Sequence, residues 1–191
     1  MRRLGVMGGT FDPPHFGHLA AASEAAYRLG LDRVAFVPTG DPWQKDPQGV
    51  SAAKDRVHMT HLAIAQDPRF FLSRVDVDRQ KKTYTVDTLR DLSREFPGAK
   101  LYFILGADSL ASLTTWKNWA EIHRLATLVG VSRPGYELRS PVDDVAVIQG
   151  PGLAISSTEC RRRAAAGAPL SYLVPRRVCE YIGSRGLYAA P

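Results

Sequence analysis

The most informative segment of the chain lies near its start: Leu4-Gly5-Val6-Met7-Gly8-Gly9-Thr10-Phe11-Asp12-Pro13-Pro14-His15-Phe16-Gly17-His18. A short apolar segment runs directly into two glycines, which predicts a buried strand followed by a turn. Gly8 and Gly9 allow a turn with positive φ and let a ligand approach the bare main chain. Pro13 and Pro14 fit the entry to a helix rather than its interior. The stretch therefore predicts a strand, a glycine turn and a helix, with a ligand site at the turn.

The two histidines of this stretch indicate what the ligand is. His15 and His18 are three residues apart, so they face the same way on the first turn of the helix. A helix N-terminus presents unpaired N–H groups and a partial positive charge, which suit a phosphate. The glycines alone could be a simple turn, and the histidines alone could be a metal pair or surface residues. However, a metal pair would more naturally be spaced four apart with a third ligand, so the complete string favours a polyphosphate site.

Composition limits the possible partners of the chain. Its 191 residues, 45% hydrophobic and 23% charged, are typical of one substantial globular domain, which we expect to span residues 1–191. The net charge of +6 suits nucleic acid, an anionic membrane surface or small polyanions. Apart from Arg2-Arg3 at the start, arginines cluster only at 161–163 and 176–177, so a long nucleic-acid stripe is not indicated. Small phosphorylated substrates explain the charge at least as well.

The cysteines and the apolar runs bear on location. Cys160 and Cys179 make neither a disulfide framework nor a zinc site, which favours a reducing compartment. The apolar residues before Gly8 are too few for a signal-peptide core, and no apolar run approaches membrane-spanning length. We therefore expect a cytoplasmic protein that does not associate with membranes.

Strand-like apolar runs alternate with helical patterns, which predicts an α/β fold with a Rossmann-like, doubly wound, largely parallel sheet and C-terminal helices. We expect strands at Arg3–Met7, Val34–Val37, Phe70–Val75, Leu101–Leu105, Thr127–Val131 and Val145–Ile148. We expect helices at Gly17–Leu29, Ala52–Ala65, Thr85–Glu95, Ala120–Leu125, Ser157–Ala166 and Pro175–Ser184. The stretch Thr39–Gly49 is expected to be a loop.

The chemically suggestive residues follow expected strands. Gly8-Gly9 follows the first strand, Lys45 the second, Gly106-Ala107-Asp108 the fourth and Arg133 the fifth. In open parallel sheets, ligands bind outside the carboxyl ends of the strands, near the switch in strand order. We therefore expect these residues to share one edge of the sheet.

The string from Gly8 to His18 resembles the signature of the nucleotidylyltransferase superfamily, which shares a His-x-Gly-His element with class I aminoacyl-tRNA synthetases. Within that superfamily the chain is most similar to the bacterial nicotinate-nucleotide adenylyltransferase family. The likeness extends from Gly8 to about Tyr188, and its further elements recur in order: Val37-Pro38 with Lys45, Tyr84-Thr85-x-Asp87-Thr88, Gly106-Ala107-Asp108, Trp116, Ser132-Arg133-Pro134-Gly135, Ile155-Ser156-Ser157-Thr158 and Tyr172-Leu173-Val174-Pro175.

The resemblance implies three catalytic residues. His18 is expected to contact the α-phosphate region of ATP in the transition state, and His15 to bind the triphosphate or orient His18. Lys45 corresponds to a loop lysine that reaches the reacting phosphates. The family usually has Pro-Pro-His-Lys where this chain has Pro42-Trp43-Gln44-Lys45, so the lysine is present and the histidine is not.

The resemblance also implies an ATP site. Asp108 would accept from the ribose hydroxyls, and Ser157 and Thr158 would hold the β- and γ-phosphates with Arg161 adding charge. From the residues alone, Asp108 is equally suited to cap a helix, and Ser156 with Glu159 fits a capping box. The expected ATP-binding residues are Gly8, Gly9, Thr10, Phe11, His15, His18, Gly106, Asp108, Ser157, Thr158 and Arg161.

The implied site for nicotinate mononucleotide contains Trp116, which would stack on the nicotinate ring. Main-chain groups near Thr85 would meet the carboxylate of that ring, and Arg133 and Lys45 would meet the phosphate. Trp119 lies three residues after Trp116, so the residues alone leave open which tryptophan faces the ligand.

The implied reaction is attack by the mononucleotide phosphate on the α-phosphorus of ATP, which expels pyrophosphate and forms deamido-NAD. Because the attacking group is already an anion, catalysis consists of positioning and charge stabilisation. Mg²⁺ is expected with the ATP, held by phosphate oxygens and without assigned protein ligands. Asp12 could hold a water of that ion or simply turn the chain before Pro13.

Three other functions stay open at this point. Two are related transferases that act on nicotinamide mononucleotide or on phosphopantetheine. The elements around Thr85 and Trp116 favour nicotinate over pantetheine, whereas the choice between acid and amide is not readable. The third is a basic nucleic-acid-binding module, which gives no reason for Trp116 or Lys45. The oligomeric state is not readable either.

Overall fold

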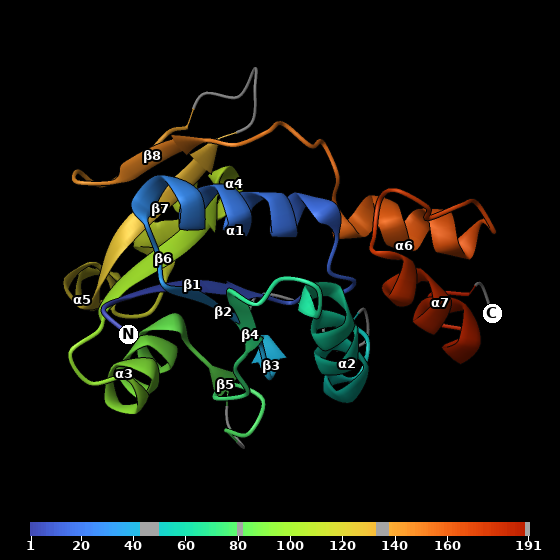
Figure 1. The fold of residues 1–191 in the computed structure, drawn as a ribbon, viewed down its shortest axis with the longest axis horizontal. Helices are drawn as coiled ribbons and strands as arrows, with labels where there is room; N and C mark the ends of the chain where they lie inside the picture. Colours follow the sequence, from blue (N-terminus) through green and yellow to red (C-terminus); the bar gives the residue numbers. More distant parts are fainter. Residues whose placement is uncertain (43–49, 80–81, 133–137, 190–191) are drawn as a thin grey trace.

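The computed structural model describes residues 1–42, 50–79, 82–132 and 138–189. Within these ranges the fold is built on a six-stranded sheet in which every neighbouring pair is parallel, in the order β4-β2-β1-β6-β7-β8 (Figure 1). Its strands are β1 (Arg3–Gly9), β2 (Arg33–Pro38), β4 (Phe70–Leu72), β6 (Lys100–Gly106), β7 (Ala126–Ser132) and β8 (Ala146–Gln149). The order reverses at β1, whose neighbours are β2 on one side and β6 on the other. This is the expected doubly wound α/β arrangement.

Helices cover both faces of this sheet. They are α1 (Phe16–Leu29), α2 (Ala53–Ile64), α3 (Thr85–Glu95), α4 (Ala107–Ala111), α5 (Trp119–Leu125), α6 (Ser157–Ala165) and α7 (Arg176–Arg185), with a 3₁₀ helix, η2 (Leu113–Thr115). Two short strands, β3 (Asp41–Pro42) and β5 (Lys82–Thr83), pair outside the main sheet.

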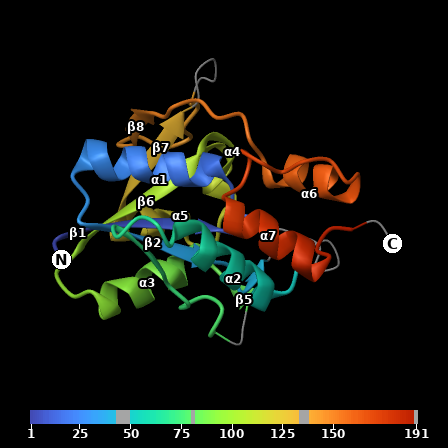
Figure 2. The same cartoon turned by 45° about the vertical axis from the view of Figure 1, so that its right-hand side comes forward.

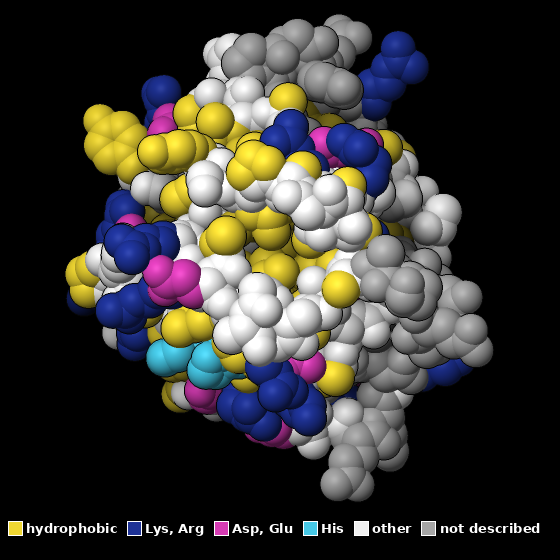
Figure 3. All heavy atoms as spheres, turned by 90° about the vertical axis from the view of Figure 1, so that its right-hand side faces the viewer, with side chains coloured by type: hydrophobic (Ala, Val, Ile, Leu, Met, Phe, Trp, Pro, Cys, Tyr) yellow, Lys and Arg dark blue, Asp and Glu magenta, His cyan; other side chains and the backbone are white. Residues whose placement is uncertain are grey.

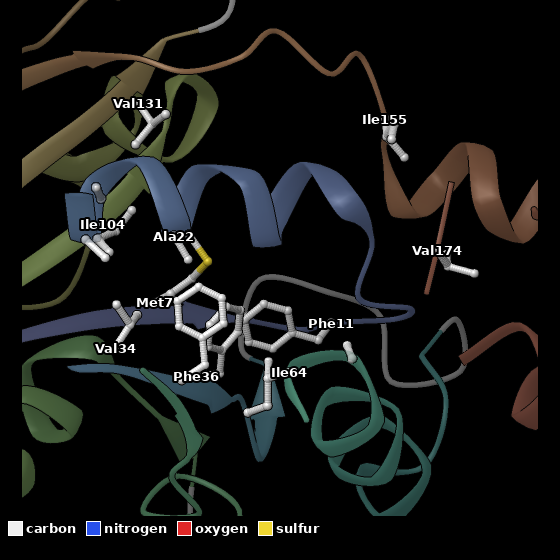
Figure 4. Close-up of a cluster of buried hydrophobic side chains, with 14 of the residues drawn as sticks. Met7, Phe11, Ala22, Val34, Phe36, Ile64, Ile104, Val131, Ile155 and Val174 are labelled. Carbon is white, nitrogen blue, oxygen red and sulfur yellow. The ribbon is translucent and has the colours of Figure 1, made fainter. Parts of the chain in front are cut away.

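The sheet separates two hydrophobic cores, because successive strand residues point to opposite faces. On β1, Leu4 and Val6 pack in the core shared with α3, α4 and α5. Met7 packs in the other core, which includes residues of α1, α2 and α7. Figure 4 shows part of this second core, in which the rings of Phe11 and Phe36 lie beneath α1 with their centroids 5.7 Å apart.

The two C-terminal helices, α6 and α7, lie beyond the carboxyl ends of the strands (Figure 1). α7 packs beside α2, as Figures 1 and 2 both show. The hydroxyl of Tyr181 on α7 donates to Oδ1 of Asp55 on α2 at 2.7 Å. The chain end thus reaches the side of the molecule where β1 and β2 end.

The elements expected from the apolar pattern are confirmed, with some differences in length. The strand expected at Phe70–Val75 ends at Leu72, after which Arg74 and Asp78 close a turn through the Asp78 N–H. Helix α4, η2 and the pair β3 and β5 were not expected, because elements of two to five residues carry too little periodicity to be recognised.

The expected positive-φ turn at Gly8-Gly9 is wrong. Both glycines belong to β1 and continue its pairing, with Gly8 opposite Val37 and Gly9 opposite Pro38. The left-handed residue is Phe11, whose φ is 51°. Pairing with β2 extends the strand, and the turn follows two residues later.

Among the residues that the structure describes, no helix is both long enough and apolar enough to span a bilayer.

Candidate active site

A cavity of about 620 Å³ lies at the carboxyl ends of β1 and β6. The chain leaves β1 toward α1 on one face of the sheet and leaves β6 toward α4 on the other, so the two connections diverge and open a crevice. The cavity is lined from β1 and the residue after it by Met7, Gly8, Gly9 and Thr10, from β6 by Phe103, Ile104, Leu105 and Gly106, and from helix starts by His15, Gly17, His18, Ala107, Asp108, Ser156, Ser157 and Thr158.

The two histidines stack at the start of α1. The ring centroids of His15 and His18 are 3.7 Å apart, and their planes differ by 27°. The N–H of His15 donates to Nδ1 of His18 at 3.2 Å. Because this nitrogen accepts a hydrogen bond, the neutral His18 ring carries its proton on Nε2. His18 can therefore present an N–H donor to an anion.

Gly17 is the residue that permits this stacking. A Cβ at position 17 would lie 2.9 Å from Nδ1 of His15 and 3.0 Å from its Cε1. His15 is only 4% exposed, so its ring has little room to move aside. The glycine between the histidines thus serves the close approach of an imidazole.

The loop between β1 and α1 is held by the protein itself. The carboxylate of Asp12, 1% exposed, accepts from the Tyr188 hydroxyl at 2.6 Å and from the Ser51 N–H at 3.1 Å. Within the described ranges, no group of three or more His, Cys, Asp or Glu residues could hold a metal ion. These contacts support the structural role of Asp12 over a role in holding an ion.

Phe11 contributes to the site indirectly. Its side chain is 1% exposed, lies outside the cavity lining and meets the His18 ring edge-on at 5.1 Å between centroids. The ring packs beneath His18. The expected place of Phe11 among the ATP-binding residues stays a prediction.

A second helix N-terminus meets the same cavity. Ser156 caps α6 by accepting from the Glu159 N–H at 3.1 Å, and Ser157 Oγ donates to the Pro13 carbonyl at 2.8 Å. The expected capping box is only half formed, because the Glu159 carboxylate bonds Arg162 and Arg163 instead. These arginines lower the pKa of Glu159 to about 2. The starts of α1 and α6 thus present two partial positive charges to one space.

Arg161 on α6 lies next to the cavity but is not part of its lining. Its Nη1 donates to the main-chain carbonyl of Asp12 at 2.8 Å, and its Nη2 lies 3.4 Å from Thr158 Oγ1. In this structure Arg161 contacts the first loop, and its expected role of adding charge near the triphosphate stays a prediction.

The other side of the cavity is formed by Trp116 with the start of α3, including Thr85 and Thr88. The Trp116 ring meets Phe103 edge-on at 6.2 Å between centroids, and its Nε1 donates to Ser112 Oγ at 3.3 Å. Trp119 is 36% exposed and does not line the cavity. Of the two tryptophans, Trp116 is the one that can meet a ligand here.

Asp76 also lines the cavity, and sequence reasoning missed it because no motif surrounds it. It accepts from Thr88 Oγ1 at 2.6 Å and from Arg79 Nη1 at 3.2 Å. Burial raises the pKa of Asp76 to about 6, while these two donors act in the opposite direction. Other cavity residues that the sequence did not single out include Ala20, Ala21, Thr39, Thr83, Ser109, Val131, Gly150, Pro151, Gly152 and Leu153.

Two of the expected site residues, Lys45 and Arg133, lie outside the described residues. Figure 3 faces the side toward which the strands point, where uncharged and apolar side chains occupy the middle and Lys and Arg side chains lie around them.

The cytidylyltransferase-like family profile matches residues 6–163. The chain is 56% identical over 197 residues to a protein of Mycolicibacterium vanbaalenii named "Probable nicotinate-nucleotide adenylyltransferase", covering 98% of this chain and 92% of that protein. It is 57% identical over 186 residues to a protein of the same name from Paenarthrobacter aurescens, covering 97% and 90%. Nicotinic acid mononucleotide adenylyltransferase of Plasmodium falciparum, solved in complex with NaAD, has a similar fold, with a TM-score of 0.83 at 18% identity and 98% coverage of both chains.

The stacking geometry makes a prediction for Gly17→Ala. Forcing a methyl group against the His15 ring should lower the free energy of unfolding by about 1–3 kcal/mol, the usual cost of overpacking. Gly183→Ala is the matched control, because a Cβ at this helical position has no atom within 4 Å. That control should be neutral or stabilising by up to about 1 kcal/mol. Equal unfolding curves for the two variants would contradict the packing argument.

The burial of Asp76 makes a prediction about pH. Its pKa is raised to about 6, against about 3.9 in an unfolded chain, so the native state binds the extra proton between these values. Wild-type stability should therefore fall as pH rises from 4 to 7, relative to Asp76→Asn, by about 2–3 kcal/mol. Urea unfolding of both proteins at pH 4, 5, 6 and 7 measures this difference. A difference that stays constant with pH would contradict it.

Proposed function

The chain belongs to the nicotinate-nucleotide adenylyltransferase family, and we propose that its cavity at the carboxyl ends of β1 and β6 is where adenylyl transfer takes place. The enzyme transfers the adenylyl group of ATP to nicotinate mononucleotide, giving deamido-NAD and pyrophosphate in NAD biosynthesis. The observation that carries the location is the convergence of two helix N-termini and two stacked histidines on one cavity.

The reaction needs positioning more than it needs a protein nucleophile. An oxygen of the mononucleotide phosphate forms a bond to the α-phosphorus, and the bond from that phosphorus to the β-bridging oxygen breaks. Pyrophosphate leaves with the electron pair, so the charges balance without proton transfer. The protein's contribution is to align two polyanions and to stabilise the charge that develops between them.

In this proposal His18 acts on the α-phosphate. Its Nε2–H donates to a non-bridging oxygen there, because its Nδ1 is already occupied by the His15 N–H. His15 fixes the orientation of that ring by stacking on it. Gly8, Gly9 and Thr10 supply the main-chain wall beside the phosphates.

The β- and γ-phosphates lie at the start of α6, where Ser157 and Thr158 line the cavity. Arg161 supports this end by holding the Asp12 carbonyl. At the end of β6, Gly106 and Asp108 line the cavity and receive the ribose of ATP.

The nicotinate ring stacks on Trp116, and its carboxylate meets the N-terminus of α3 at Thr85. Lys45 and Arg133 are proposed to meet the reacting phosphates and the mononucleotide phosphate, on the basis of the sequence alone. A cytoplasmic location stays a prediction from the sequence.

Mg²⁺ fits this cavity only as part of the nucleotide complex. The Asp12 carboxylate is already bonded to Tyr188 and Ser51, so the ion would be held by phosphate oxygens and water. Bound in this way, it would neutralise charge on the triphosphate and on the leaving pyrophosphate.

A nucleic-acid-binding module is not favoured by the arginine clusters. Arg162 and Arg163 pair with Glu159, and Arg176 pairs with Glu180. These clusters therefore offer less free positive charge than the sequence count suggests.

The function is tested by measuring pyrophosphate release with ATP and a panel of acceptors: nicotinate mononucleotide, nicotinamide mononucleotide and phosphopantetheine. The highest kcat/KM is expected with nicotinate mononucleotide, with deamido-NAD as the product. A preference for phosphopantetheine, or no turnover with any acceptor, would contradict the proposed function.

His18→Ala should lower kcat about 100- to 1,000-fold with little change in KM for either substrate, because the lost donor acts on transition-state charge. His58→Ala, an exposed histidine on α2, is the control and should keep wild-type kcat. Circular dichroism and melting should stay close to wild type in both. A tenfold or smaller loss in His18→Ala would remove His18 as a principal catalyst.

Trp116→Ala should weaken nicotinate mononucleotide and leave ATP nearly unaffected. Loss of one stacking partner costs about 1–3 kcal/mol, which is roughly a five- to 150-fold rise in Kd. Trp119→Ala should change neither Kd. Separate titrations of the two substrates, with a melting curve for each variant, decide the matter. Equal loss of both affinities with a much lower Tm would mean that Trp116 is only a core residue.

A further inference from the structure

Arg56 on α2 is a buried charged side chain with an unusual set of partners. It is 1% exposed and makes no ion pair with a described carboxylate. Its guanidinium instead donates to four main-chain carbonyls: Nε to Ser51 at 3.0 Å, Nη1 to Thr10 at 3.0 Å and Thr39 at 2.7 Å, and Nη2 to Gly40 at 2.9 Å. One side chain thus fixes the main chain at four positions.

These positions belong to the exits of two neighbouring strands. Thr10 directly follows β1, Thr39 and Gly40 directly follow β2, and Ser51 precedes α2. The Thr39 N–H also donates to the Gly9 carbonyl at 2.9 Å, which joins the two exits directly. Thr10 and Thr39 both line the cavity, so the hydrogen bonds from Arg56 to their carbonyls fix the main chain of two cavity residues.

Only an arginine satisfies this arrangement. Its planar guanidinium presents five N–H donors in a fixed fork, whereas a lysine ammonium presents three donors at one point. Burial lowers the pKa of Arg56, and the nearby Asp12 carboxylate opposes that shift. The charge of Arg56 is thus kept inside the protein by four carbonyl oxygens and a carboxylate.

We propose that Arg56 is a positioning residue for adenylyl transfer, which fixes the main chain at Thr10 and Thr39 so that the cavity wall keeps its reactive geometry. This inference rests on the proposed function. A mutation far from the chemistry that misplaces the reacting groups by about 1 Å can cost about 100-fold in rate. Arg56 touches no substrate and acts through the main chain of two cavity residues.

The test compares Arg56→Lys with Ile64→Ala. Ile64 is a buried apolar residue of the same helix that packs in the core and does not line the cavity, so its variant reports the effect of destabilising α2. Arg56→Lys should lower kcat about 10- to 100-fold with KM for both substrates within about fivefold, at a temperature where both variants are folded. Ile64→Ala should keep kcat within about twofold despite its lower Tm.

Arg56→Lys with wild-type kcat, or Ile64→Ala with an equal loss of kcat, would overturn the positioning role. Inactive wild-type enzyme with nicotinate mononucleotide would instead overturn the proposed function.

Hydrogen exchange on the wild-type chain needs no variant and covers the case in which Arg56→Lys does not fold. The Thr39 amide should exchange as slowly as the central amides of β1 and β6. Fast exchange there would show that the strand exits are not held and would also overturn the proposal.

Discussion

Strands β1 and β6 lie side by side and parallel, yet the chain leaves them toward opposite faces of the sheet, and the whole site depends on this divergence. It places a crevice beside the main chain of Gly8 and Gly9 and aims the start of α1 into it. Two partly charged helix ends then meet there, because Ser157 ties the start of α6 to the Pro13 carbonyl. The C-terminal region also contacts this site, because the Tyr188 hydroxyl donates a hydrogen bond to the Asp12 carboxylate in the loop between β1 and α1.

The glycine between the histidines shows how local packing serves this geometry. Because Gly17 has no Cβ, the His15 ring can lie against the start of α1 and stack on His18. The stacked pair in turn rests on Phe11, whose left-handed main chain directs its ring into the core. The catalytic group that we propose is thus supported by a buried aromatic side chain, and its donor is set by one main-chain hydrogen bond.

Apolar periodicity was enough to predict the parallel sheet and its covering helices, because the central strands β1, β2, β6 and β7 are mostly buried on both faces and the longer helices bury one side. It was also enough to predict that Gly8-Gly9 and Gly106-Ala107-Asp108 meet at one edge. It could not predict contacts between residues far apart in the chain, such as Arg161 with the Asp12 carbonyl or Arg56 with the strand exits. The positive φ was assigned to the glycines because glycine favours it, whereas strand pairing moved the turn to Phe11.

In the proposed mechanism this site aligns two anions and provides no covalent intermediate. The stereochemical course at the α-phosphorus tests it most directly, with ATP made chiral at that atom by sulfur and oxygen isotopes. A single in-line displacement by the mononucleotide phosphate predicts inversion of configuration in the dinucleotide product. Retention would require two displacements, with the adenylyl group first carried by a protein group such as His18, and would contradict the account.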